Sequence, residues 1–125
     1  MGRLRNKNTL DYSFPKADRI LRRSEFLRLS RSGKKLHSRY FIANILPGKS
    51  DRTRLGITVT KKVGNAVTRN RLKRLSREFF RLNRQNITGN RDISIIVKKQ
   101  AAALSTDHFF EHLENIFGKI SGGGY

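Results

Sequence analysis

The sequence predicts an α+β sandwich, in which helices pack against one face of a β-sheet and leave its other face available. Residues 54–60 and 92–98 each alternate between apolar and polar side chains, as strands with one buried face do. Between these stretches, apolar residues recur at the spacing of a single helical stripe, namely Leu72, Leu75, Phe79 and Leu82. We therefore expect the order helix, two or three strands, helix, strand, helix.

The first helix is expected to be short, covering about two turns over residues 25–32. Ser24 is a suitable N-cap for it, and Gly33 is a suitable stop. Phe26 and Leu29 lie on one face of this helix. Before it, residues 14–20 are expected to run extended.

The strands are predicted from three stretches of the chain. Residues 35–46 are rich in β-forming side chains and end at Pro47-Gly48, which indicates a strand followed by a turn. Residues 54–60 are expected to pair with that strand as a hairpin. The alternation over 54–60 and 92–98 directs one apolar set toward the core: Leu55, Ile57, Val59, Ile93, Ile95 and Val97. The opposite set is small, polar and cationic, and we expect that face to be open.

Two further helices complete the predicted fold. Asn65 is a suitable N-cap for a helix from Ala66 to about Arg84, and Gly64 gives the preceding turn conformational freedom. A last helix is expected to begin near residues 105–107 and to end at Gly118. Its core residues recur at helical spacing: Phe109, Leu113, Ile116 and Phe117.

The composition indicates one domain with a polyanionic partner. The chain has 28 Lys and Arg against 9 Asp and Glu, a net charge of +19 on 125 residues, so most cations cannot find an internal acidic partner. Arginine suits phosphate well, so nucleic acid is favoured over a membrane surface. No apolar run approaches the roughly 20 residues that cross a bilayer. We expect a single RNA-binding domain over residues 1–125, with flexible tails at 1–12 and 119–125.

One side of the predicted basic helix is almost wholly cationic. Arg69 and Arg71 border the apolar stripe, while the opposite side carries Asn70, Lys73, Arg74, Arg77, Arg81 and Arg84. Like charges three and four residues apart destabilise a helix by a few tenths of a kcal/mol each, unless a polyanion neutralises them. The alternative is a solvated helix face, which the net charge disfavours. Phosphate is the natural counter-charge.

A second candidate surface lies on the open face of the sheet. If Phe26 leans over that face, its ring forms an aromatic wall beside a floor of Thr58, Thr60, Ser94 and Lys98. A single strand of RNA would fit there, because bases stack on aromatic rings and cations hold the backbone. The alternative is that Phe26 is a core residue, and both interpretations are open at this point.

Residues 61–77 carry a specific resemblance to a known family. Their sequence, KKVGNAVTRNRLKRLSR, is similar without a gap to the signature of the bacterial ribonuclease P protein subunit, including its Arg-Asn-Arg core. The resemblance extends in element order over residues 19–117 and includes Ser24-Glu25-Phe26. It implies a four-stranded sheet in the order α-β-β-β-α-β-α, with a left-handed βαβ crossover around the basic helix. The sequence alone would suggest the right-handed form.

The resemblance also implies a function. Proteins of this family are accessory subunits of a ribonucleoprotein endoribonuclease that removes the 5′ leader of precursor tRNA, and the RNA subunit is the catalyst. The implied contacts with the catalytic RNA are Lys61, Lys62, Asn65, Arg69, Asn70, Arg71, Lys73, Arg74 and Arg77. Mg²⁺ would be held mainly by the RNA. One protein per RNA and a cytoplasmic location are expected.

The implied contacts with the precursor leader are Phe26, Tyr40, Asn44, Thr58, Thr60 and Lys98. The chain departs from the family pattern within this set. Family members often carry a second aromatic residue where this chain has Ser30, and an aromatic residue where it has Asn44. Leader stacking is therefore expected to be weaker here, or to be moved to Tyr40 or Phe14.

An independent enzyme is the competing class, and its parts are missing from the sequence. His108 and His112 are four residues apart, but Glu111 is misplaced for a metalloprotease motif and no third ligand is evident. With no cysteine, a thiol nucleophile and a thiolate metal site are excluded. We therefore expect neither catalytic nor metal-binding residues in the protein. A ribosomal or general RNA-binding protein of similar fold is the alternative, and the signature helix disfavours it.

Overall fold

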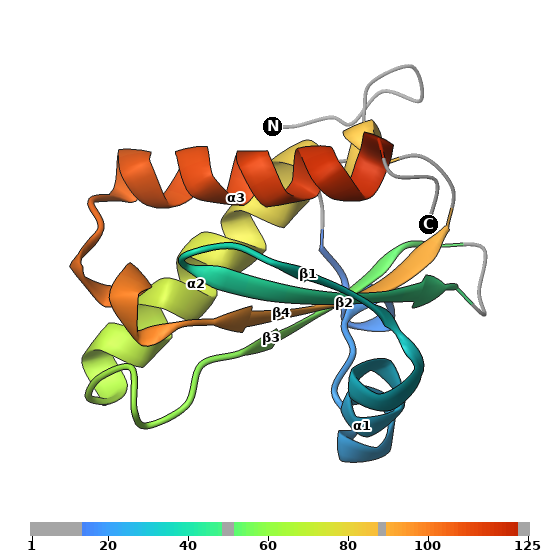
Figure 1. The fold of residues 1–125 in the computed structure, drawn as a ribbon, viewed down its shortest axis with the longest axis horizontal. Coiled ribbons are helices and arrows are strands. Elements are labelled where there is room, and N and C mark those ends of the chain that lie inside the picture. The colour runs from blue at the N-terminus through green and yellow to red at the C-terminus, as the bar shows by residue number, and fades with distance from the viewer. Residues whose placement is uncertain (1–13, 49–51, 88–89, 123–125) are drawn as a thin grey trace, which may run out of the picture.

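The structure is a computed structural model that describes residues 14–48, 52–87 and 90–122 (Figure 1). One four-stranded sheet is formed by β1 (Lys34–His37), β2 (Phe41–Pro47), β3 (Arg54–Thr58) and β4 (Arg91–Val97). The helices are α1 (Arg23–Ser32), α2 (Ala66–Asn83) and α3 (Thr106–Gly122), with short 3-10 turns η1 (Lys16–Asp18), η2 (Arg84–Asn86) and η3 (Lys99–Ala103). The predicted α+β class and the order α-β-β-β-α-β-α are confirmed.

The predicted hairpin between β2 and β3 is wrong, because β4 lies between them. The strand order is β1-β2-β4-β3, with β4 antiparallel to β2 and parallel to β3. β4 is buried along nearly its whole length, as a strand covered on both faces is, and it therefore takes a central position. α2 joins the parallel strands β3 and β4 as a crossover. The left hand of that crossover stays a prediction.

The outer edge of β3 is covered by the segment before α1. The backbone N–H of Ile20 donates to the carbonyl of Leu55 at 2.9 Å, and Arg19 forms an isolated parallel bridge with Leu55. This segment was expected to run extended, but it contains the turn η1. Phe14 at its start is buried, with its ring centroid 5.1 Å from that of Phe80. The edge of the sheet is thereby protected from unwanted strand pairing.

The main core lies between the sheet and the layer of α2 and α3, while α1 lies on the opposite side of the sheet (Figure 1). The rings of Phe41 on β2 and Phe109 on α3 are fully buried and meet edge to face, with centroids 5.3 Å apart. The residues predicted to point inward are buried, except Ile57, which is only partly buried. The alternation pattern therefore assigned the core face correctly.

α2 begins as predicted and packs on a slightly different stripe. The Asn65 side chain accepts a hydrogen bond from the N–H of Thr68 at 2.9 Å and so caps the helix. Leu82, which was expected on the apolar stripe, is 43% exposed, whereas Phe80 is fully buried. The two residues lie about 80° to either side of Leu72 on the helix. Phe14 and Phe117 pack against Phe80, on the side of the helix away from Leu82.

α3 does not end at Gly118, as predicted, but continues to Gly122. Ile120 extends the apolar stripe and is fully buried. Glycine within a helix costs about 1 kcal/mol relative to alanine, and burial of an isoleucine side chain contributes about 1.5–3 kcal/mol. A flexible tail is thus wrong for residues 119–122. Residues 123–125 and the predicted arm at 1–12 lie outside the described residues.

α1 begins at Arg23 rather than after Ser24, and its N-cap residue Arg22 makes no side-chain cap. Glu25 in the first turn of α1 forms an ion pair with Arg54 of β3, at 2.7 Å. The end of the helix at Gly33 is confirmed. A Cβ at Gly33 would lie 2.5 Å from the carbonyl oxygen of Leu29 and 3.1 Å from that of Ile45, so only glycine lets the chain turn into β1 here.

Candidate RNA-binding surface

α2 and its entry turn present cations on the side away from the core. Lys61, Lys62, Asn65, Asn70 and Arg74 are exposed, and Arg69, Arg71, Lys73 and Arg77 are partly exposed. In the described part of the chain, no carboxylate pairs with any Lys or Arg of this set. All nine residues predicted to contact the catalytic RNA therefore lie along one helix and the turn before it, and the seven charged ones have no carboxylate partner among the described residues.

Arg69 and Arg71 border the apolar stripe of α2, as predicted. The Nη2 atom of Arg71 lies 3.4 Å from the carbonyl oxygen of Leu104 and 3.4 Å from the hydroxyl of Thr106, at the start of α3. The Nε atom of Arg69 is buried and has no hydrogen-bond acceptor among the described residues. Such a donor costs about 1–3 kcal/mol while it remains unpaired, so a rotation of the Arg69 side chain that brings Nε to a phosphate oxygen would relieve an existing penalty.

The cationic line on α2 is shorter than predicted. Arg81 donates two hydrogen bonds to Glu78, at 3.1 and 2.5 Å. Arg84 donates to Asp18 at 2.6 Å, and its guanidinium lies 5.4 Å from the centroid of Phe80. Both arginines already have carboxylate partners, and the uncompensated line ends at Arg77.

Asp18 is a fully buried carboxylate that joins three segments. It accepts hydrogen bonds from Nε and Nη2 of Arg52, before β3, and from Nη1 of Arg84, directly after α2. Burial by itself would raise the pKa of Asp18, but the bonds from Arg52 and Arg84 outweigh that effect and hold the pKa below its ordinary value of 3.8. The N-terminal segment is thereby fixed to the end of α2.

α1 is held against the sheet by a second network. Arg54 on β3 donates from Nε and Nη2 to the two oxygens of Asp92, at 3.0 and 2.9 Å, and Nη2 also donates to Glu25 of α1 at 2.7 Å. These bonds, first with Asp92 and then with Glu25, raise the pKa of Arg54 above its ordinary value. Asp92 is fully buried, and Arg28 of α1 lies 3.8 Å from it. The sheet face that was predicted to be open is therefore covered here by α1.

Phe26 lies on the outer face of the sheet, against Gly56 of β3. A Cβ at Gly56 would lie 2.5 Å from Cε1 and Cζ of Phe26, so a glycine is needed beneath the ring. Phe26 is partly exposed and does not belong to the main core cluster, although Leu29 on the same helix is fully buried. Its ring is thus positioned by packing and still has free surface.

Three other predicted leader residues lie on or beside the same face. Thr58 is two residues beyond Gly56 on β3 and is partly exposed, and Thr60 is exposed. Lys98 follows β4 and is partly exposed, with Nζ donating to the carbonyl of Ser38 at 2.7 Å. Beneath Phe26, Gly56 pairs in register with Ser94, which is buried.

Two predicted leader residues and one suggested substitute do not join this group. Asn44 is 1% exposed, and its side-chain oxygen accepts a hydrogen bond from Lys35 at 2.9 Å. The ring of Tyr40 packs against His112 of α3, with centroids 4.4 Å apart. Phe14 belongs to the main core. The free aromatic surface on the α1 side therefore comes from Phe26, because the position one turn later is Ser30, which is exposed.

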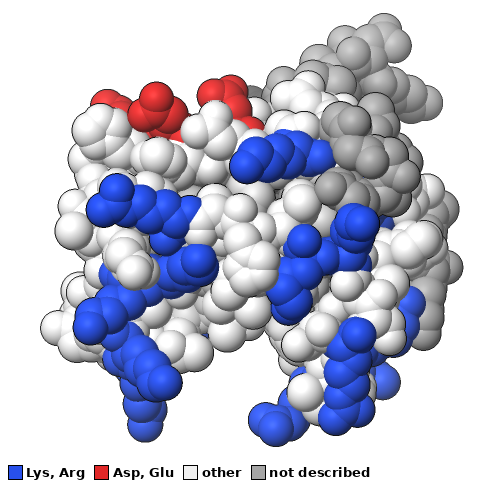
Figure 2. Space-filling model, viewed as in Figure 1, with Lys and Arg blue, Asp and Glu red and all other residues white. Residues whose placement is uncertain are grey.

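The charges of the molecule are separated between its sides (Figure 2). Below the sheet the surface is hollowed between α1 and the turn that leads to α2, and Lys and Arg side chains stand on both sides of the hollow. Acidic side chains gather along the outer face of α3, where Asp107, Glu111 and Glu114 are exposed. The other carboxylates within the described ranges, Asp18, Glu25, Glu78 and Asp92, are paired with arginines.

Sequence reasoning missed the residues that hold this surface in place, chiefly Asp18, Arg54 and Asp92. The available signal was a carboxylate at the start of an otherwise apolar strand, which is uncommon unless the charge is paired. Residues 14–48, 52–87 and 90–122 contain no group of three or more His, Cys, Asp or Glu side chains arranged to hold a metal ion. Over the same ranges, none of the helices combines the length and apolarity that a membrane span requires.

Comparison with known proteins gives a consistent result. Residues 14–121 match the family described as Ribonuclease P. The ribonuclease P protein component of Desulforapulum autotrophicum is 55% identical over 109 residues, which cover 87% of this chain and 93% of that protein. The corresponding protein of Desulfosudis oleivorans is 48% identical over 110 residues, covering 88% and 91%.

Solved structures agree with these sequence matches. The ribonuclease P protein of Staphylococcus aureus superposes with a TM-score of 0.79 at 34% identity, covering 86% of this chain and all of that one (100%). The ribonuclease P protein of Thermotoga maritima superposes with a TM-score of 0.76 at 35% identity, covering 83% and 98%. Together with the cationic helix at residues 66–83, these matches show that the chain belongs to the ribonuclease P protein family.

Proposed function

We propose that this protein binds the RNA subunit of ribonuclease P through the cations of α2 and its entry turn, and that it assists removal of the 5′ leader from precursor tRNA. Members of the family are subunits of a ribonucleoprotein endoribonuclease that acts in tRNA 5′ processing. The observation that supports RNA binding most strongly is the line of uncompensated cations on α2, with the unpaired Nε of Arg69 beside it. Family membership does not favour the alternative, a ribosomal protein.

For the leader we propose the outer face of the sheet beside α1, with Phe26, Thr58, Thr60 and Lys98 as the residues that touch it. Phe26 offers a fixed ring for stacking, and Lys98 offers a cation for the backbone. Asn44 and Tyr40 are left out of this proposal, because one is buried and the other packs on α3.

The chemistry is assigned to the RNA. Mg²⁺ ions would be held mainly by RNA phosphates, since the protein surface that faces the RNA is cationic and repels divalent cations. The protein neutralises phosphate, which lets RNA segments approach one another. We further propose one protein per RNA and a cytoplasmic location, where precursor tRNA is found.

The helix is tested by replacing Arg69 and Arg74 with alanine. Binding to the cognate ribonuclease P RNA should weaken by at least about tenfold, and the log–log salt slope should fall by about 0.7–0.9 for each phosphate that the variant no longer neutralises. Lys119→Glu is the control, because it changes the net charge by the same two units on exposed α3. Equal affinities of parent and double variant, with unaltered circular dichroism, would refute the helix site.

The leader face is tested by Gly56→Ala, which should push the Phe26 ring away from β3. The new methyl group would lie 2.5 Å from the Phe26 ring, which can rotate, and 3.1 Å from Cβ of the buried Ile20, so the melting temperature of the variant is measured alongside. Preference of the holoenzyme for precursor over mature tRNA should fall by at least about fivefold, the low end of base-stacking energies.

Two variants complete this test of the leader face. Phe26→Ala should reproduce the loss of preference. Gly118→Ala is the matched control, because no atom lies within 4 Å of a Cβ there. If precursor and mature tRNA weaken equally and the melting temperature drops, Phe26 acts as a core residue instead.

A further inference from the structure

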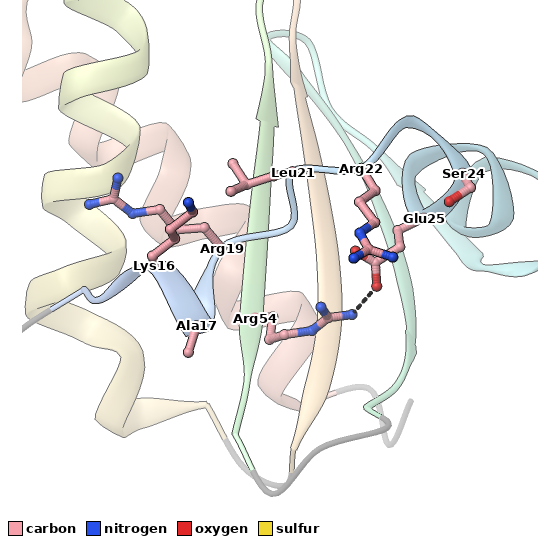
Figure 3. Close-up of a pocket in the computed structure, with 8 residues that line it drawn as sticks. All are labelled: Lys16, Ala17, Arg19, Leu21, Arg22, Ser24, Glu25 and Arg54. Carbon is pink, nitrogen blue, oxygen red and sulfur yellow. Dashed lines mark hydrogen bonds and ion pairs between the residues drawn. The ribbon is translucent and has the colours of Figure 1, made fainter.

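A cationic cavity lies at the edge of β3, between the N-terminal segment and α1 (Figure 3). Its volume is about 660 Å³, and it is lined by Lys16, Ala17, Arg19, Leu21, Arg22, Ser24, Glu25 and Arg54. Figure 3 shows Arg19 extending toward α2 at one end, with Lys16 close to it, while Arg22 lies beside Glu25 and Arg54 at the other. Lys16, Arg19 and Arg22 belong neither to the proposed RNA-binding residues of α2 nor to the proposed leader face.

The charge of this cavity is not neutralised internally. Its single lining carboxylate, Glu25, is bonded to Arg54, which also binds Asp92. Within the described residues, Lys16, Arg19 and Arg22 have no carboxylate partner. The cavity therefore carries three uncompensated positive charges and suits an anionic ligand.

Arg19 is held in place without a carboxylate partner among the described residues. Its Nε and Nη2 donate to the carbonyl of Phe14 at 3.3 and 3.0 Å, and its guanidinium lies 4.9 Å from the centroid of the Phe14 ring. Asp18, the residue before it, is anchored by Arg52 and Arg84. A cation positioned in this way loses little conformational entropy when it meets a phosphate.

The cavity continues toward α2. Arg19 also lines a cavity of about 220 Å³ together with Arg74 and Arg77 of α2, and another of about 180 Å³ together with Phe26 and Arg77. Three adjoining cavities thus share Arg19, and two share Arg77. We call this surface the β3-edge groove, defined by Arg74, Arg77, Arg19, Lys16 and Arg22.

We propose that the sugar–phosphate backbone of the RNA bound by α2 continues along the β3-edge groove and is held there by Lys16, Arg19 and Arg22. This inference rests on the proposed binding of the ribonuclease P RNA by α2. The catalytic RNA is the favoured occupant because the groove begins at Arg74 and Arg77, whereas the proposed leader face begins on the outer surface of the sheet. Backbone binding is favoured over base reading because the cavity of about 660 Å³, which holds Lys16 and Arg22, has four cations and no aromatic ring in its lining.

The test is the double variant Lys16→Ala/Arg22→Ala, since both side chains are exposed. Its affinity for the cognate ribonuclease P RNA alone should fall by about tenfold, and its log–log salt slope should fall by about 1.4–1.8 if each removed cation had neutralised one phosphate. Arg19→Gln should weaken binding in the same direction. Lys119→Glu changes the net charge equally at a distant site and should leave the affinity within about twofold, because exposed charges beyond a Debye length are screened.

A second measurement distinguishes the catalytic RNA from the precursor leader as the occupant of the groove. The holoenzyme is assembled at saturating protein, and precursors with long and short leaders are bound to it. If Lys16→Ala/Arg22→Ala binds the RNA subunit normally but loses affinity for long leaders only, the groove holds the leader and the proposal is overturned. It is also overturned if the variant matches the parent in every measurement. Failure of the proposed function would look different, because the parent protein itself would then not bind the RNA.

Discussion

Arg54→Met should lower the free energy of unfolding by about 3–5 kcal/mol, the usual result of removing one partner from a buried ion pair. Asp92 is fully buried and receives two hydrogen bonds from Arg54. Without them, only Arg28 at 3.8 Å remains near this carboxylate among the described residues. Glu25 loses its bond to β3 in the same step, so the first turn of α1 should loosen.

The companion variant separates the loss of the pair from the loss of the side chain. In Arg54→Met/Asp92→Leu both charges are gone, and apolar replacements of a buried pair are often neutral. Urea denaturation of the parent, both single variants and the double variant forms a cycle whose coupling term should exceed about 1 kcal/mol. Additive losses would mean that Arg54 and Asp92 stabilise the fold independently, contrary to the bidentate geometry.

Asp18→Asn should destabilise the protein at neutral pH by about 3 kcal/mol, because two arginines lose a shared carboxylate. The pKa of Asp18 is lower in the folded protein than its ordinary value of 3.8, so the folded state favours the ionised form. The contribution is therefore complete above pH 3.8 and is lost as the pH falls through the folded pKa. Parent and variant should differ by a constant amount from about pH 7 to 5 and should converge in stronger acid.

Asp107→Asn is the matched control for that experiment. It makes the same chemical change at an exposed carboxylate of α3 that has no ion pair with the described residues. Its stability should stay within about 0.5 kcal/mol of the parent at every pH. If Asp18→Asn follows the same pH curve as the parent, with a constant offset into strong acid, then Asp18 is not the group that titrates.

The parts of the fold that depend on local pattern could be predicted from sequence. The cap at Asn65 and the alternation of β3 and β4 each depend on residues within a few positions of one another. Which strands lie next to each other does not depend on such local residues, because alternation shows which face of a strand is buried but not which strand pairs with it. β3 therefore looked like the hairpin partner of β2, although β4, more than 30 residues later in sequence, separates them.

The two candidate surfaces differ in how far sequence could predict them, and the reason is the same. Cations on α2 share one helix, so their common side follows from the helical repeat. Which residues of the outer sheet face are accessible depends on where α1 lies. α1 is placed by the bonds that Arg54 makes to Glu25 and Asp92, which are 29 and 38 residues away from it in sequence. Asn44 was expected at the leader face from the family resemblance, but it is buried in the folded protein.

The acidic outer face of α3 also has a kinetic consequence. With the free carboxylates of the described chain on one side and the cations of α2 on the other, the protein carries a large electric dipole in addition to its net charge. In the field of a polyanion, this dipole turns the molecule during diffusion, so that first encounters occur with α3 facing outward. Fewer collisions then occur in unproductive orientations. The association rate constant should therefore be high in dilute salt and should fall steeply as salt is added.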